Sequence, residues 1–457
     1  MNRRSFLHTT LGGVALAMIS ERVGAGSSWK PFDFKPFRSG RYPVPVWKVT
    51  PDDGFYVHTF FDVCPWSPSG NYLLVTRFDF QGRKPSWGDQ AAVCVIDLKN
   101  QRIREIYRTR AWSFQLGTNC QWDAVSDRYI YTNDIIEDEV VCVRIDWEAG
   151  TFKAFTGPLY SVSPDGRKVV SPNLLNMNIH QYGYAVPDGP TGKPIPFTPG
   201  DMEREGLWCT DLTNDRKSLL MPLSRFFEAA ADEKLYEGMV GYLFHSKFNR
   251  QNTRILQVFR AQRNNEGRNA SLFTLNTDGT GLKQCLSAEK WNQKARSGGS
   301  GNHPNWHPDG EHIIMNCIPT WLGFDEMKFC RFRYDGADFT VLSEKIAGSG
   351  HPSVDQSGRY LVTDAYPKQT YVKGPEGEVA IRLIDLNEDR ETRLCDIPND
   401  VGGGTAQATA ETRKTGGSHF KLDPHPAWSR DYRQLCFNGA PDGIRQVFLA
   451  DLQGIIS

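Results

Sequence analysis

A short segment recurs seven times along this chain, and a repeat of this kind constrains the fold more strongly than any other feature of a sequence. The clear copies mostly end in Asp-Gly or Ser-Gly, and they occupy residues 64–70, 160–166, 304–310, 352–358 and 426–432. Two weaker copies, at residues 120–126 and 246–252, fill the gaps. A run rich in β-branched and aromatic residues follows each copy. Such a turn between two strand-like runs is typical of a β-hairpin.

Each copy opens a unit of about 40–85 residues, which is long enough for four short strands. Seven such units predict an all-β fold, a seven-bladed β-propeller over residues 27–457, in which radial closure leaves only short sheet edges. A chain divided into separate domains is the alternative. Because a ring must join its ends, we expect a segment between residues 46 and 58 to pair with the strand at residues 446–452.

Two stretches interrupt the regular spacing of the repeat. Residues 187–237 begin rich in Pro and Gly, and we expect a loop there on one face of the propeller. We expect a second loop at residues 396–418. The only helical structure predicted is in short pieces such as residues 225–235.

The first residues resemble an export signal of the twin-arginine (Tat) type. Arg3 and Arg4 precede Ser-Phe-Leu, residues 11–19 are modestly apolar, and residues 23–25 are Val-Gly-Ala, as at a cleavage site. This order predicts a signal peptide over residues 1–26 and a periplasmic or extracellular mature protein. No later apolar run approaches the roughly 20 residues of a membrane span, so no span is expected.

Charge and cysteine content narrow the class of protein further. The 53 basic and 53 acidic residues give a formal net charge of zero, which disfavours a nucleic-acid binder. The ten cysteines stand singly, mostly in strand-like runs, and none forms a Cys-x-x-Cys motif. We therefore predict buried free thiols. One or two disulfides remain an alternative for an exported protein.

Aligning the seven copies reveals a set of histidines. The residue just before each copy is, in chain order, Val63, Asn119, Leu159, His245, His303, His351 and His425. Inner strands surround the central channel of a propeller, and equivalent positions lie at one height around it. Four imidazoles are therefore predicted to converge at one end of the channel. Three of these histidines precede a proline, which favours an extended backbone.

Neutral imidazole is a common ligand of divalent metals, so these four histidines are predicted to hold a divalent metal, Zn²⁺ or Mn²⁺. His419 is a possible extra ligand. The alternative is that the four histidines only form hydrogen bonds between neighbouring blades.

Several motifs also carry a resemblance to known families. They are Gly-Asn-His-Pro-Asn-Trp at 301–306, Gly-Ser-Gly-His-Pro at 348–352, Asp-Pro-His-Pro-Ala-Trp at 423–428, Phe-Gln-Leu-Gly-Thr-Asn at 114–119 and Gln-Tyr-Gly-Tyr at 181–184. An exported seven-bladed propeller with these motifs resembles the oligogalacturonate lyases and is similar to the propeller-type ulvan lyases. Both families cut an acidic polysaccharide by β-elimination beside a uronic acid.

The resemblance to the oligogalacturonate lyases implies that His351 and His425 are metal ligands. It implies that His303 is either a ligand or the base that removes the proton. The ulvan lyases use a tyrosine as base and acid, and Tyr184 and Tyr242 resemble those tyrosines. In that family a histidine neutralises the substrate carboxylate. The position that resembles it is occupied here by Asn119, which departs from the ulvan-type pattern.

β-Elimination removes a weakly acidic proton α to a carboxylate, so the developing negative charge needs a metal, Arg, Asn or His nearby. Arg260, which follows the fourth inner strand, supplies a candidate positive charge. The predicted catalytic set is therefore Tyr184, Tyr242, Asn119, Arg260 and His303.

The sequence thus predicts a secreted lyase that acts on an acidic, uronic-acid-containing poly- or oligosaccharide. A non-catalytic TolB-like binding propeller is one alternative, which explains the repeat but not the four histidines. A propeller glycoside hydrolase is another. It needs two carboxylates about 5–10 Å apart, and Asp62, Asp134 and Asp364 are not obviously paired.

Overall fold

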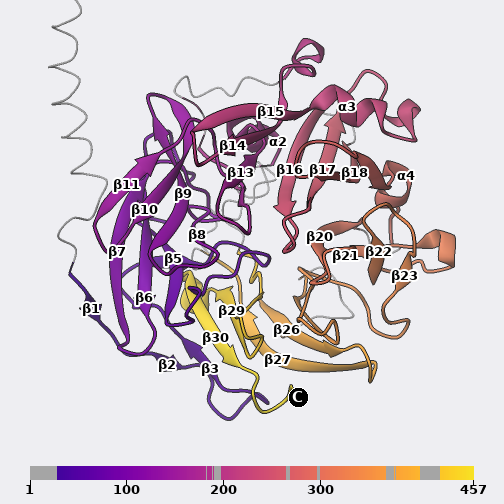
Figure 1. The fold of residues 1–457 in the computed structure, drawn as a ribbon. Helices are drawn as coiled ribbons and strands as arrows, with labels where there is room; N and C mark the ends of the chain where they lie inside the picture. Colours follow the sequence, from indigo (N-terminus) through magenta and orange to yellow (C-terminus); the bar gives the residue numbers. More distant parts are fainter. Residues whose placement is uncertain are drawn as a thin grey trace, which may run out of the picture.

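The computed structural model describes residues 28–181, 183–187, 189, 197–263, 268–295, 299–366, 375, 377–401 and 422–456. The predicted signal peptide and His419 lie outside these residues. Figure 1 shows antiparallel sheets arranged as blades in a ring around a centre. The predicted all-β, seven-bladed propeller is confirmed.

The first three blades follow the chain from inside to outside. The first contains β4 (Phe55–Val57), β5 (Tyr72–Phe78), β6 (Ala91–Asp97) and β7 (Arg102–Thr109), with β1 (Lys30–Pro31) added at its edge. The second contains β8 (Gln121–Trp122), β9 (Tyr129–Ile136), β10 (Glu139–Asp146) and β11 (Thr151–Ala154). The third contains β12 (Ser161–Val162), β13 (Lys168–Ser171), β14 (Gly206–Asp211) and β15 (Arg216–Pro222).

The next three blades have the same order. The fourth contains β16 (Val240–Phe248), β17 (Arg254–Gln262), β18 (Arg268–Asn276) and β19 (Lys283–Leu286). The fifth contains β20 (Asn302–Trp306), β21 (His312–Cys317), β22 (Lys328–Arg333) and β23 (Thr340–Val341). The sixth contains β24 (Ser353–Val354), β25 (Tyr360–Asp364), β26 (Glu378–Asp385) and β27 (Arg390–Pro398).

The seventh blade joins the two ends of the described chain. Its inner strands are β28 (Ala427–Trp428), β29 (Gln434–Gly439) and β30 (Gln446–Asp451), and the N-terminal strands β3 (Val46–Lys48) and β2 (Lys35–Pro36) complete it. Val46 pairs with Ala450 in an antiparallel register. The predicted closure is therefore confirmed.

The repeated segment is the inner strand and its turn. Its third residue pairs with the following strand in every blade, as in Phe248 with Ile255 and Trp428 with Leu435. In Trp122, Trp306 and Trp428 this residue also holds neighbouring blades together, because its indole N–H donates to a carbonyl of the preceding blade, at 3.2 Å from Trp428 to Ser353. The aromatic repeat positions thus serve packing between blades.

The stretch at residues 187–237 was expected to be a loop, and this expectation is wrong for much of its length. It contains β14 and β15, because Leu207 and Cys209 bury their side chains in the core of the third blade. Pro and Gly at its start marked only the connection before these strands. The loop expected from residue 396 also begins later, since β27 continues to Pro398.

Short helices occupy the connections between strands. They are α2 (Leu174–His180), η1 (Pro199–Asp201), α3 (Leu223–Glu228), η2 (Glu233–Tyr236), α4 (Ala288–Trp291), η3 (Thr320–Leu322) and η6 (Pro441–Gly443). The helix expected at residues 225–235 is thus two pieces, α3 and η2. Within the described ranges, every helix is too short or too polar to span a bilayer. All ten cysteines are free thiols, and nine of them are buried.

Candidate functional site

The four aligned histidines lie beside one another at the centre of the ring. The rings of His303 and His351 stack with centroids 3.8 Å apart, and the ring of His425 meets that of His351 edge-on at 4.4 Å. His245 continues the series, with its ring 6.4 Å from that of His303. Four consecutive blades therefore bring their imidazoles together.

A local irregularity of the inner strands accompanies this arrangement. His245, His303 and His425 have left-handed backbone conformations, with φ of 57°, 51° and 51°, and Asn119 shares this conformation at 51°. In the sixth blade the left-handed residue is Gly350, directly before His351. Non-glycine residues rarely adopt this conformation, and it is concentrated at functional sites.

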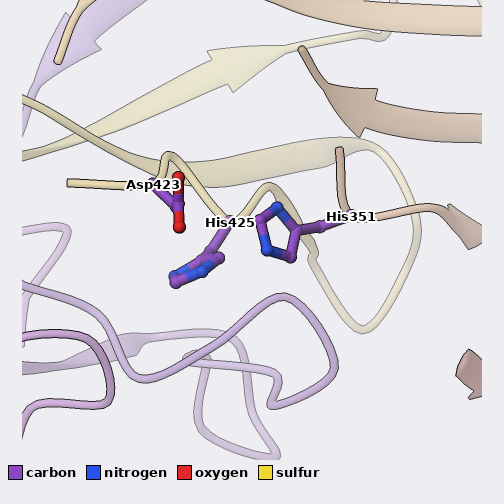
Figure 2. Close-up of side chains that lie close together, drawn as sticks. All are labelled: His351, Asp423 and His425. Atoms are coloured by element: carbon purple, nitrogen blue, oxygen red, sulfur yellow. The ribbon is translucent and has the colours of Figure 1, made fainter. Parts of the chain in front are cut away.

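A candidate metal site consists of His351, Asp423 and His425, whose ligand atoms all lie within 4.8 Å of one another. Figure 2 shows Asp423 and His425 on one segment of chain, with His351 facing them from another. All three residues are buried. The sequence analysis missed Asp423, although its place two residues before His425 was a usable signal. His245 and His303, which were predicted as ligands, are not in this group.

Asp364 orients the first of these ligands. Its Oδ1 lies 2.8 Å from Nδ1 of His351. When the carboxylate is ionised it accepts a hydrogen bond from the Nδ1–H group, so the neutral ring of His351 keeps its lone pair on Nε2. Metal-binding histidines commonly donate their other ring N–H to a carboxylate in this way. Burial, followed by the charge of Asp423, raises the pKa of Asp364.

The protonation state of the cluster suits metal binding. Burial is the main cause that lowers the pKa of His245, His303 and His425 well below the usual histidine range, so these rings are neutral at neutral pH. Both ring nitrogens of His425 are buried and have no hydrogen-bond partner among the described residues. A buried unsatisfied polar atom costs about 1–3 kcal/mol, and a metal ion would satisfy one of them. The donor set therefore fits a divalent metal.

His303 differs from the other three because its side chain is partly exposed. Its Nδ1 lies 2.7 Å from the Gly350 carbonyl oxygen, which can only accept, so Nδ1 carries the proton and Nε2 is basic. The Tyr366 hydroxyl lies 2.8 Å from the same Nδ1 atom. This geometry suits a general base.

His245 is held differently. Its Nδ1 lies 2.9 Å from the Tyr160 hydroxyl oxygen, and the residue is 2% exposed. This contact, from the third blade to the fourth, resembles the inter-blade hydrogen bonding that was the alternative to a metal role.

A pair of arginines forms the second part of the site. Nη1 of Arg260 and Nη1 of Arg268 donate to the same amide oxygen, Oε1 of Gln181, at 2.6 and 3.0 Å. Neither guanidinium forms an ion pair with an acidic side chain among the described residues. Burial, followed by repulsion from Arg268, lowers the pKa of Arg260 to about 10. Guanidinium groups without an acidic partner have donors of the geometry that carboxylates and phosphates accept.

Tyr242 and Tyr184 lie in this second part. The Tyr242 hydroxyl accepts a hydrogen bond from Arg268 at 3.3 Å, and its ring stacks on His180 with centroids 4.6 Å apart. Tyr184 is buried, and its ring meets that of Phe244 at 5.5 Å. Its ring also meets that of Phe60 edge-on at 6.4 Å. Arg268 and His180 were missed because they lie outside the repeated segment.

Asn119 lies in the same register as the histidines but makes a different set of contacts. Its side-chain amide donates to the carbonyl oxygens of Leu159 and Tyr160 at 3.1 and 3.2 Å, and Gln121 donates to its oxygen at 3.2 Å. The amide thus links the second and third blades. The catalytic role predicted for Asn119 stays a prediction.

The chain is similar in structure to two solved oligogalacturonate lyases. One, described as a complex with manganese, is 14% identical, with a TM-score of 0.63 over 93% of this chain and 98% of the other. The second, from Vibrio parahaemolyticus, is also 14% identical, with a TM-score of 0.61 over the same shares of each chain. No family model matches the sequence, and no curated protein matches it. At this identity the likeness concerns the fold alone, and the chain shares with these lyases a seven-bladed β-propeller.

Proposed function

We propose that this protein is a lyase that cleaves a uronic-acid-containing poly- or oligosaccharide by metal-assisted β-elimination. One observation carries the proposal: a buried His351–Asp423–His425 group suited to a divalent metal lies beside the partly exposed base candidate His303. The likeness to oligogalacturonate lyases supports the same chemistry.

The arginine pair is proposed to bind the uronate carboxylate. Arg268 is exposed and Arg260 is buried, so the pair offers donors both at the surface and inside. A carboxylate would provide the negative charge that Gln181 lacks. Charge-assisted hydrogen bonds of this kind also stabilise the negative charge that develops during elimination.

His303 is proposed to remove the α-proton through Nε2. The electrons of that C–H bond form a carbon–carbon double bond, the bond to the glycosidic oxygen on the next carbon breaks, and the leaving oxygen takes up a proton. Zn²⁺ or Mn²⁺ bound by His351, Asp423 and His425 would supply positive charge beside the carboxylate. Tyr184 and Tyr242 are the alternative bases, as in the ulvan-type chemistry.

An absorbance assay for the unsaturated product distinguishes the candidate functions. We would incubate the protein with polygalacturonate, oligogalacturonates and ulvan, with chelator or with added Mn²⁺ or Zn²⁺, and follow absorbance of the unsaturated product. Metal-dependent unsaturated ends support the proposal. New reducing ends without unsaturation indicate a glycoside hydrolase, and binding without cleavage indicates a TolB-like binding module.

We also propose that the protein is exported to the periplasm or beyond by a Tat-type signal. The support is the order of Arg3–Arg4, the apolar stretch and the small residues that follow. Replacing both arginines by lysine should retain the protein in the cytoplasmic fraction. Unchanged export of that variant would contradict the proposal.

A further inference from the structure

The inner strand of the first blade is broken by a loop, unlike those of the fourth and fifth blades. It pairs regularly until Val57, which lies opposite Thr76. Pairing resumes where the Leu74 N–H donates to the Pro65 carbonyl at 2.8 Å. Residues 58–64 therefore leave the strand as a loop.

The fourth and fifth blades interrupt the strand at the same point by far less. In the fourth blade only His245 is skipped in the pairing, and in the fifth only His303 and Pro304 are skipped. The first blade thus carries a seven-residue loop at the register position where four blades carry a histidine.

Phe60 of this loop lies among the histidines. Its ring stacks on that of His245 at a centroid distance of 5.4 Å and an interplanar angle of 24°. It meets the ring of His425 at 4.4 Å and that of His351 at 5.8 Å. Only 2% of Phe60 is exposed.

Phe61 continues the same contact surface. Its ring lies 5.2 Å from that of His351 and 5.9 Å from that of His303. Together Phe60 and Phe61, which we call the aromatic floor, contact the ring of every aligned histidine.

A buried ion pair anchors the floor. Nζ of Lys247 lies 2.6 Å from Oδ2 of Asp62, the residue after Phe61, and both side chains are less than 10% exposed. The same ammonium donates to the Pro304 carbonyl at 2.8 Å and lies 4.7 Å from the centre of the Phe61 ring. Burying a charge pair is costly, so a pair of this kind is better suited to holding one arrangement than to adding stability.

The floor also divides the channel. A cavity of about 310 Å³ extends into the channel and is lined by Phe60, Phe61, Asp62 and Lys247, among others, but by none of the four histidines. Its lining comes instead from the inner strands and turns beyond them, such as Trp306. The histidine cluster is therefore separated from this cavity by the two rings.

We propose that Phe60 and Phe61, locked by the Asp62–Lys247 pair, are positioning residues that fix the imidazole rings of the cluster and close the channel beneath them. The inference rests on the proposed function, since it assigns positioning residues to the same site. Because four blades must present their imidazoles at one point, a rigid surface shared by all four rings keeps the ligand atoms at a fixed separation.

The test compares Phe60→Leu with Phe273→Leu. Leucine at position 60 keeps an apolar filler but removes the flat ring. Phe273 is fully buried in the fourth blade against Phe226 and Phe259, and its ring meets none of the four histidines of the described residues. Its variant therefore reproduces the loss of a buried ring away from the cluster. Two measurements are made on each protein: the affinity for Mn²⁺ by calorimetry, and the imidazole ¹H–¹³C spectrum of metal-free protein.

We expect Phe60→Leu to weaken Mn²⁺ binding at least tenfold and to shift or broaden the imidazole signals of several histidines. Phe273→Leu should change neither the Mn²⁺ affinity nor the imidazole signals, even if it lowers the unfolding temperature as much as Phe60→Leu does. Unchanged imidazole signals in Phe60→Leu overturn the positioning role. If the wild type binds no Mn²⁺ while the signals still respond to Phe60→Leu, the floor stands and the metal-assisted function falls.

Discussion

Nδ1 of His351 lies 2.8 Å from Oδ1 of Asp364, and the same carboxylate accepts the backbone N–H groups of both His351 and His425. One buried acid thus joins the sixth and seventh blades at the point where the candidate metal ligands meet. Asp364→Asn should keep the shape but weaken the orientation of His351, and we expect Mn²⁺ affinity to fall about 10–100-fold. Calorimetry measures this.

The matched control for that change is Asp385→Asn, which alters another buried, hydrogen-bonded aspartate of the sixth blade that pairs with Arg359. Its Mn²⁺ affinity should equal that of the wild type. If Asp364→Asn also bound Mn²⁺ as tightly as the wild type, Asp364 would have no part in orienting the metal ligands.

The ligand group makes a second prediction, on metal content. The purified wild type should carry about one Zn²⁺ or Mn²⁺ per chain, and His351→Ala/His425→Ala should carry none, because two of the three ligands are lost. Asp423→Ala should reduce the content as well. Elemental analysis measures this, with His312→Ala as a control, since His312 pairs with Asp309 away from the cluster. A double variant with full metal content and activity would rule out this site.

The identity of the base makes a third prediction. His303→Ala should lower kcat about 10²–10⁴-fold, the usual cost of losing a general base, while metal content stays unchanged. Tyr184→Phe and Tyr242→Phe should retain most of the turnover. If a tyrosine variant loses turnover while His303→Ala keeps it, the ulvan-type mechanism is favoured. Full activity in all three variants would show that the assigned site is wrong.

The arginine pair makes a fourth prediction. Arg268→Gln should raise KM for a uronate substrate about 10–100-fold, because a charge-assisted hydrogen bond contributes about 1.5–3 kcal/mol. A methyl-esterified substrate, which lacks the charge, should show little difference between variant and wild type. Arg254→Gln, a change on the neighbouring strand β17 at its other end, serves as the control. An equal loss on charged and esterified substrates would argue against carboxylate binding.

The buried histidines make a fifth prediction, on pH. Burial lowers their folded-state pKa values, to about 4 for His58 and well below the usual histidine range for His245, His303 and His425. Below about pH 6.5 the unfolded chain therefore binds protons that the folded chain does not, so stability falls as pH falls. Asp364, with a raised pKa, acts in the opposite direction but is a single group.

In chelator-treated protein the unfolding temperature should therefore be nearly constant from pH 8 to 7 and decline steadily from pH 6.5 to 4.5. Thermal unfolding followed by circular dichroism measures this. A flat profile down to pH 4.5 would show that the imidazoles are not buried as neutral groups.

The repeat made most of the fold predictable. An inner strand, its turn and the returning strand are close together in the sequence. Copies of the repeated segment, such as those ending at Gly310 and Gly358, therefore predict both the blade and its register. The same register predicted that His245, His303, His351 and His425 would be neighbours, because equivalent positions of a closed ring share one height. The closure of Val46 against Ala450 followed from the need to join the ends.

Only the tertiary structure decided which atoms meet within the cluster. Asp423 and Phe60 lie in irregular segments, and Arg268 begins strand β18. All three lie outside the repeated segment, where no periodicity relates one blade to another and long-range packing sets the position of each side chain. The broken strand of the first blade is an example: the repeat copy begins at Cys64, after the loop that carries Phe60. The sequence by itself determined the ring and the height of its histidines, whereas the partners of those histidines depended on contacts between residues far apart in the chain.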